Sequence, residues 1–217
     1  MNKTKIPTAA YVAFGTMYYE PENLRMISER AEKQLVSAGL TLVKTDPVYG
    51  EDEEPERAIR ELKTREWDFL FVNIINWIDT RGVFRVLHEF RDKPMILYSL
   101  GGFTDHEGTF EKKGTLISPA AGAGSTSLRL PMEQWGIKFR YLYNAPDSPM
   151  DIEGILSFAR AAHTATRILR VATWSIIEES ADWRRRSMCP TRLFSASLRL
   201  SMTTCSQITI NIRPEPM

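Results

Sequence analysis

The sequence predicts an α/β fold, a doubly wound parallel sheet with helices on both of its faces. Its most apolar stretch is DFLFVNIINWIDT at residues 68–80, in which Phe69 to Val72 show no alternation of apolar and polar side chains. A strand of this kind is covered on both faces, as in a parallel sheet between two layers of helices. Short apolar runs also alternate with segments of helical period from residue 9 to about residue 166. This alternation is typical of successive βα units.

Two βα units precede this central strand. Residues 9–14 form a short apolar strand closed by Gly15, and a helix follows from Pro21 to a stop at Gly39. The apolar positions of that helix recur at helical spacing, at Leu24, Ile27, Ala31 and Leu35. Residues 40–44 are the second strand, and the acidic residues 51–54 lead into a helix that ends near residue 64. Acidic side chains suit the positive end of a helix dipole.

Three more helices and two more strands follow the central strand. Apolar residues at helical spacing predict a helix around residues 83–90, and MILYSL at residues 95–100 is the fourth strand. A helix at residues 125–134 with an interruption at Pro131, a strand at residues 138–143 and a helix from residue 152 to about residue 166 complete the pattern. Five βα units in succession favour a five-stranded, flavodoxin-like sheet in the order 2-1-3-4-5.

The composition changes near residue 170, which divides the chain into an α/β domain at residues 1–169 and a second region at residues 170–217. Every glycine lies at or before Gly154, whereas both cysteines follow Met188. Residues 170–177 fit the start of a sixth strand, but beyond them the turn residues and helix caps of an α/β unit are missing. We interpret this region as the start of a second domain or as an atypical, truncated or out-of-frame tail, and we expect it to be poorly ordered.

The charge balance argues against two classes of partner. The net charge is +1, so the chain lacks the basic excess of proteins that bind nucleic acid or an anionic membrane. No segment reaches the roughly 18 apolar residues that span a bilayer, and the N-terminus lacks the apolar core of a signal peptide. We therefore expect a cytoplasmic protein, and we assign no function to Cys189 and Cys205.

Two polar motifs each have two interpretations. Asp105, His106 and Glu107 carry metal-competent side chains, but adjacent residues rarely converge on one ion, and a solvent-facing loop is preferred. GAGSTS at residues 122–127 would place N–H groups and hydroxyls at a helix N-terminus, as in phosphate-binding loops. It lacks a third glycine, and a loop with a serine N-cap is the simpler interpretation. The sequence therefore predicts no catalytic residue and no metal ligand.

Three stretches follow one another in a recognisable order: DFLFVNIINWIDT at residues 68–80, KPMILYSLGG at residues 93–102 and STSLRLPMEQWGIKFRYLY at residues 125–143. Together they resemble the amino-terminal domain of the L-fucose and L-arabinose isomerases, over roughly Thr8 to Ile168. The resemblance implies a multidomain aldose–ketose isomerase, in which a divalent cation such as manganese polarises the sugar oxygens and carboxylates move a proton. The family's metal ligands and acid/base residues belong to later domains, which are not recognisable here. The chain is thus interpreted as an amino-terminal fragment that is inactive alone, has no cofactor of its own and takes part in a homo-oligomer.

Strand order and resemblance together predict a sugar-binding site. In the order 2-1-3-4-5 the first and third strands are neighbours, so residues 15–19 lie beside residues 73–77. The family places an aromatic residue of the sugar pocket after the third strand, and Trp77 matches it, although packing at the sheet edge explains a tryptophan equally well. The predicted substrate-binding residues offer polar groups to the sugar hydroxyls and flat faces to its ring: Thr16, Tyr18, Tyr19, Asn73, Asn76 and Trp77. A flavodoxin-like domain that binds a sugar or nucleotide without turnover is the alternative, and a module that only assembles is a third possibility.

Overall fold

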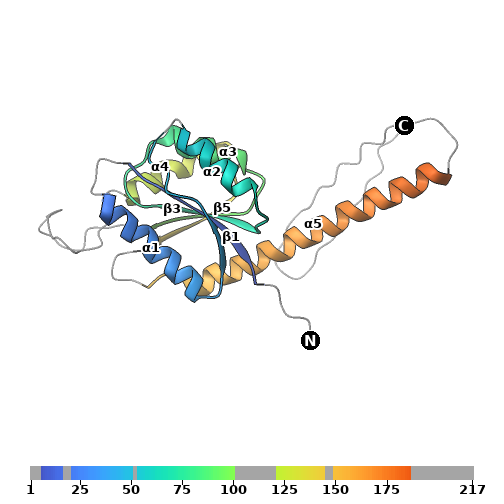
Figure 1. Ribbon diagram of the computed structural model, residues 1–217, viewed down its shortest axis with the longest axis horizontal. Helices are drawn as coiled ribbons and strands as arrows, with labels where there is room; N and C mark the ends of the chain where they lie inside the picture. The colour runs from blue at the N-terminus through green and yellow to red at the C-terminus, as the bar shows by residue number, and fades with distance from the viewer. Residues whose placement is uncertain (1–5, 17–20, 51–52, 101–120, 145–148, 187–217) are drawn as a thin grey trace, which may run out of the picture. The chain divides into compact units, whose positions relative to one another are not determined.

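The computed structural model describes residues 6–16, 21–50, 53–100, 121–144 and 149–186. In chain order the elements are β1 (Thr8–Phe14), α1 (Pro21–Ser37), β2 (Thr41–Lys44), α2 (Glu53–Lys63), β3 (Phe69–Ile74), α3 (Thr80–Glu89), β4 (Met95–Leu100), α4 (Ala121–Gln134), β5 (Phe139–Asn144) and α5 (Ile152–Arg186) (Figure 1). The chain divides into two compact units, Met1–Ala172 and Thr173–Met217, and all the named strands belong to the first. The domain boundary expected after residue 169 stays a prediction.

The five strands form one parallel sheet in the order β2-β1-β3-β4-β5. This confirms the predicted flavodoxin-like topology. The central strand β3 pairs with β1 on one side, where Tyr11 lies opposite Phe71, and with β4 on the other, where Asn73 lies opposite Tyr98. All six residues of β3 are buried.

Helices cover both faces of the sheet, so the side chains of each inner strand alternate between two separate cores. Along β3, Leu70, Val72 and Ile74 belong to the core closed by α2, α3 and α4, whereas Phe69 and Phe71 belong to the core closed by α1 and the start of α5. Figure 1 shows α2, α3 and α4 on the side of the sheet opposite to α1. Because each set of side chains meets helices, both sets are apolar, which explains the unbroken run in the sequence. Full burial of a Phe or Leu side chain contributes about 1.5–3 kcal/mol.

The last helix is longer than the sequence predicts. We expected it to end near residue 166 and a strand to begin at residues 170–177, whereas α5 continues to Arg186. The expected strand is wrong. Val171, Ile176 and Ile177 favour a strand locally, but no glycine or proline follows Gly154 within α5, so the helix continues at the gain of one hydrogen bond per residue. Residues 187–217 lie outside the described part of the chain, and the expected disorder of the tail stays a prediction.

A hydrogen bond between two partly buried side chains joins α5 to the amino ends of two strands. His163 Nδ1 lies 2.9 Å from Asp68 Oδ1, and the other carboxylate oxygen of Asp68 accepts a hydrogen bond from the Thr8 backbone N–H at 2.8 Å. Asp68 precedes β3 and Thr8 begins β1. One carboxylate therefore ties the helix and both central strands together.

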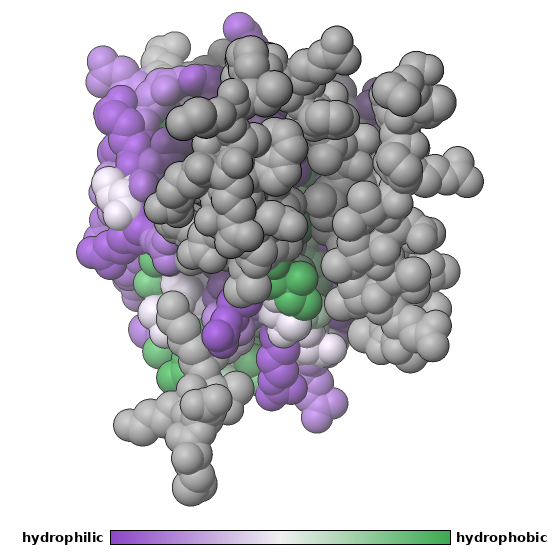
Figure 2. All heavy atoms as spheres, turned by 90° about the vertical axis from the view of Figure 1, so that its right-hand side faces the viewer, coloured by the Kyte–Doolittle hydropathy of each residue, from purple (hydrophilic) through white to green (hydrophobic). Residues whose placement is uncertain are grey.

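In the face shown in Figure 2, hydrophilic side chains predominate among the coloured residues, with a few apolar ones between them. Of the helices in the described ranges, none is both long and apolar enough to cross a membrane.

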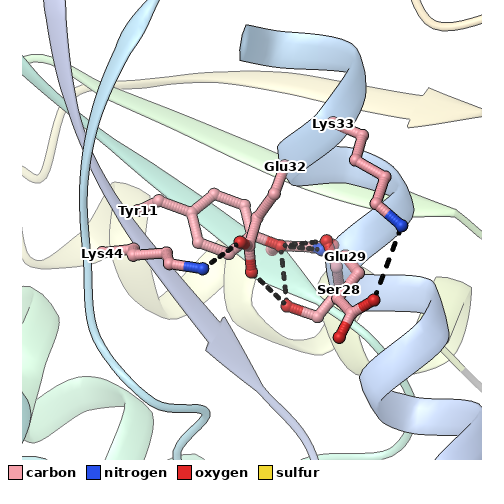
Figure 3. Close-up of polar contacts among 7 residues, drawn as sticks. Tyr11, Ser28, Glu29, Glu32, Lys33 and Lys44 are labelled. Carbon is pink, nitrogen blue, oxygen red and sulfur yellow. Dashed lines mark hydrogen bonds and ion pairs between the residues drawn. The ribbon is translucent and has the colours of Figure 1, made fainter.

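A chain of hydrogen bonds leads from the buried centre of the sheet to the surface (Figure 3). Asn73 Nδ2 donates to the hydroxyl of Tyr11 at 2.7 Å, and that hydroxyl lies 3.1 Å from both the carbonyl oxygen and the hydroxyl of Ser28. Ser28 in turn donates to Glu32, which accepts from Lys44 Nζ at 2.8 Å. Because a carboxylate only accepts, the Ser28 proton goes to Glu32 and the Tyr11 proton to Ser28. Burial raises the pKa of Tyr11, so its phenol keeps that proton.

Replacing Tyr11 by Phe tests whether this chain of hydrogen bonds stabilises the fold. The ring stacked on Phe71 at 5.9 Å would remain, but Asn73 Nδ2 would lose its acceptor in a fully buried position. A buried donor without a partner costs about 1–3 kcal/mol, so we expect the free energy of unfolding in urea to fall by that amount. Tyr143→Phe is the matched control, because Tyr143 is 47% exposed. Equal unfolding midpoints for both variants and the parent would contradict the prediction.

Candidate functional site

Two loops at the carboxyl edge of the sheet are joined by the side chain of Asn76. The backbone N–H of Thr16 donates to Asn76 Oδ1 at 2.8 Å, and Asn76 Nδ2 donates to the Thr16 carbonyl oxygen at 2.9 Å. The side-chain amide of Asn76 thus makes two hydrogen bonds to the backbone of Thr16. These bonds lie just beyond the carboxyl ends of β1 and β3. This places residues 15–16 beside residues 75–76, as the sequence predicts. The structure therefore holds the edge at the β1–β3 junction in one conformation.

Gly15 is required by this arrangement, because its backbone approaches the Asn76 side chain closely. A Cβ at position 15 would lie 2.4 Å from Asn76 Oδ1, far inside the contact distance of a carbon and an oxygen. The Gly15 N–H also donates to the Val48 carbonyl oxygen at 3.1 Å, which joins the loop after β2 to the same edge. In the sequence Gly15 only marks the end of a strand. In the structure it allows the segments after β1, β2 and β3 to meet.

Trp77 is the most exposed of the predicted site residues that the structure describes. Its side chain is 48% exposed, whereas its neighbours Asn76 and Ile78 are 0% and 4% exposed. The next residue, Asp79, caps α3 by accepting a hydrogen bond from the Arg81 N–H at 3.0 Å. Hydrogen bonds of Asn76 and Asp79 therefore fix the backbone on both sides of Trp77. Its indole is exposed at the end of β3.

The other described site residues are buried. Asn73 and Asn76 are fully buried and Thr16 is 6% exposed, and the amide nitrogens of both asparagines already donate within the protein. Two atoms, Thr16 Oγ1 and Asn73 Oδ1, find no hydrogen-bond partner within the described ranges. The buried asparagines shape the edge, and the unpaired Thr16 Oγ1 and Asn73 Oδ1 atoms are themselves buried. Tyr18 and Tyr19 lie outside the described residues.

The GAGSTS motif lies inside α4 and not in a loop before it. The helix begins at Ala121, four residues before the expected start at Ser125, and Pro131 lies within it without ending it. A Cβ on Gly124 would lie 3.0 Å from the Asn76 backbone oxygen, and a Cβ on Gly122 would lie 3.0 Å from the Tyr143 ring. The small residues thus let the first turn of α4 pack closely over the carboxyl edge.

The hydroxyls of the same motif are used within the protein. Ser125 Oγ lies 2.9 Å from the Ser99 hydroxyl and 3.0 Å from the Tyr141 hydroxyl, and it donates to the Gly122 carbonyl oxygen at 3.1 Å. Ser99 and Ser125 are fully buried. Together these contacts bind α4 to β4 and β5. The sequence analysis missed this role, although serines among apolar strand residues indicate buried polar contacts across a sheet.

Half-exposed aromatic rings flank this first turn of α4. Gly124 adjoins Asn76, next to Trp77, and Gly122 adjoins Tyr143, which is 47% exposed. The alternation in β5 could have indicated Tyr143, since side chains two apart in a strand share a face. The described part of the edge thus exposes flat aromatic surfaces, whereas the Thr16 hydroxyl is buried.

Metal binding finds no support in the described ranges. No group of three or more His, Cys, Asp or Glu side chains there is placed to hold an ion. Asp105, His106 and Glu107 lie outside these ranges, so the structure says nothing of them.

Comparisons of the chain with models of protein families and with curated proteins give no match. The resemblance to the sugar isomerases therefore stays a prediction, and function has to be argued from the site itself.

Two alanine substitutions test the packing of α4 over the edge. Gly124→Ala would push a methyl group against the Asn76 carbonyl oxygen and the Ile74 side chain, which lies 3.2 Å away. Because that carbonyl belongs to backbone fixed by the Asn76 amide, we expect a loss of about 1–3 kcal/mol of unfolding free energy. Gly122→Ala meets only the half-exposed Tyr143 ring, which can swing away, so the gain in helix propensity of up to about 1 kcal/mol should prevail. Equal unfolding midpoints for the two variants would show that α4 is not tightly seated.

Proposed function

We propose that the α/β domain is the amino-terminal part of a metal-dependent aldose–ketose isomerase of the L-fucose and L-arabinose isomerase kind. In this proposal the domain supplies one wall of the sugar pocket and a surface for assembly into a homo-oligomer, and it performs no chemical step itself.

The observation that carries the proposal is the exposure of the Trp77 side chain next to a fixed backbone. Its indole is half-exposed at the carboxyl edge of the sheet, between the buried Asn76 and Ile78. Ligands of open α/β sheets bind outside the carboxyl ends of the strands, at the point where the strand order reverses. In this sheet that point lies between β1 and β3, and Trp77 follows β3 directly.

The exposed ring at this edge matches one of the two needs of a sugar ligand. A pyranose has an apolar face of C–H groups, which packs on a flat aromatic ring, and hydroxyls, which need hydrogen-bond partners. Trp77 offers the ring. The Thr16 hydroxyl has no partner within the described ranges but is buried, so the proposal leaves the sugar hydroxyls to the other walls of the pocket. The bonds from Asn76 to Thr16 fix the backbone next to Trp77, which lowers the entropic cost of binding.

The described residues of this edge do not fit the manganese or other divalent cation that the resemblance implies. They offer hydroxyl, amide and aromatic groups, and no cluster of carboxylates or histidines that could hold an ion. The proposal therefore gives this domain the binding of one face of the sugar. Metal binding and proton transfer are left to other domains of the assembled enzyme.

Replacing Trp77 by Ala, in a version of the protein that carries a complete isomerase, tests the proposal. We expect KM for the aldose to rise about five- to tenfold with a smaller change in kcat, because loss of aromatic stacking removes roughly 1 kcal/mol of substrate binding. The matched control is Trp135→Ala, since Trp135 is similarly exposed, at 53%, on another part of the surface. Kinetic constants of Trp77→Ala equal to those of the control, with fold and oligomer intact, would leave Trp77 as a packing residue.

The chain as given should not isomerise aldoses when manganese is added, because the proposal assigns the proton transfer to other domains. Ketose formation from L-fucose or L-arabinose, measured by a colorimetric ketose assay, checks this. Turnover above the protein-free blank would overturn the assignment. Saturable binding of a sugar to this chain, without turnover in any complete version, would favour the alternative of a sensing domain.

A further inference from the structure

A groove away from the carboxyl edge lies between α3 and the end of α4. Its volume is about 370 Å³, within the range of roughly 300–1,000 Å³ found for small-molecule sites. The lining residues are Thr80, Arg81, Phe84, Arg85, His88 and Trp135. Two of them are aromatic, two are arginines and none is acidic, so the lining combines flat apolar surface with positive charge.

On the α3 side, the groove is lined by side chains from one face of the helix. Arg81, Phe84, Arg85 and His88 are spaced by three, one and three residues, which places all four on the same face. The opposite face of α3 is buried against the sheet. Because the opposite face packs on the sheet, these four side chains face solvent.

Trp135 forms the aromatic wall on the other side, and its position is fixed by the way α4 ends. Gly136, with φ of 72°, terminates the helix. The N–H groups of Gly136 and Ile137 donate to the carbonyl oxygens of Glu133 and Met132 at 3.0 and 2.9 Å. This is the Schellman pattern of a helix C-terminus, stabilised here by burial of Ile137 and Met132 in the same core. The Trp135 backbone is thus rigid, although its side chain is 53% exposed.

Contacts with α3 orient the indole. Its ring centroid lies 4.6 Å from that of Phe84, with an angle of 58° between the planes, and 6.4 Å from that of His88. Phe84 supports the indole and leaves part of it open to the groove, so a flat ligand can stack on Trp135 without a rearrangement of the protein.

The Arg85 guanidinium is held in place beside this wall. Its Nε donates to Glu56 at 2.6 Å and its Nη1 lies 3.6 Å from Glu89. A guanidinium has five N–H donors, so these two contacts leave donors for a ligand. Arg85 is a positioned cation whose hydrogen-bonding capacity is only partly used.

From this arrangement we propose that the groove binds an anionic ligand with a flat aromatic ring, of the nucleoside monophosphate class. The base stacks on Trp135, and the phosphate accepts hydrogen bonds from Arg85 with His88 beside it. Arginine suits phosphate because its planar donors match two phosphate oxygens at once. The six lining residues include no carboxylate, although Glu56 and Glu89 contact Arg85 from outside the lining. This site does not depend on the sugar-binding role proposed for Trp77.

Isothermal titration calorimetry of the whole chain with AMP tests the proposal, with adenosine and ribose 5-phosphate as probes that each lack one half of the ligand. We expect saturable binding of AMP, at least tenfold tighter than of either probe, and weaker binding at high salt. Trp135→Leu should weaken AMP binding about tenfold, because each factor of ten corresponds to about 1.4 kcal/mol and stacking is worth roughly that much. Arg85→Gln should weaken AMP binding while leaving adenosine unaffected, which a merely structural arginine would not do.

Matched controls keep the test decisive. Leu130→Ala and Arg60→Gln remove an exposed apolar side chain and an exposed arginine that do not line the groove, and both should bind AMP as the parent does. Thermal unfolding of each variant shows whether it is folded. Three results would overturn the proposal: no AMP binding by the parent, AMP binding unchanged in folded Trp135→Leu and Arg85→Gln, or loss of AMP binding in Leu130→Ala alone. Sedimentation in which Trp135→Leu turns an oligomer into a monomer would assign the groove to contact between copies, and would also overturn it.

Discussion

The burial of β3 on both faces is the constraint on which the rest of the domain depends. The strand pairs on both sides, and its side chains point alternately into two cores, each closed by its own helices. A strand in this position has no edge or face that water can reach, so every residue along it must be apolar or hydrogen-bonded inside the protein. The helices on both faces follow from this requirement.

Asn73 and Asn76 are the polar exceptions, and both connect elements. Asn73 lies inside the strand and donates to Tyr11, which carries the contact through Ser28 to α1. Asn76 lies just past the strand and bonds to the backbone of Thr16. The bonds that these amides make connect β1 to β3 and hold the loops beyond them together, although Asn73 Oδ1 has no partner within the described ranges. The exposed ring of Trp77 depends on that fixed backbone.

The two regions that we consider functional are built in the same way. At the carboxyl edge, Trp77 is exposed between two buried neighbours, and between α3 and α4, Trp135 is exposed beside a glycine-terminated helix end. In each case an apolar ring that would be better buried is held outward by a rigid backbone. Single exposed apolar side chains are common on protein surfaces, so the functions proposed for these two regions depend on the residues around each ring.

The sequence by itself determined the five βα units, their order in the sheet and the juxtaposition of residues 15–16 with residues 75–76. These follow from the two-sided apolar character of β3 and from the crossover rules of parallel sheets, which depend on pattern and not on atomic detail. Only the tertiary structure decided that Asn73 and Asn76 are buried connectors, that GAGSTS is the packed first turn of α4, and that Trp135, Phe84 and Arg85 share a groove. These depend on contacts between residues far apart in the chain. The course of α5 through residues 170–177 was missed for the opposite reason: a few β-branched residues gave a local signal for a strand, and the continuity of a helix without a breaking residue outweighed it.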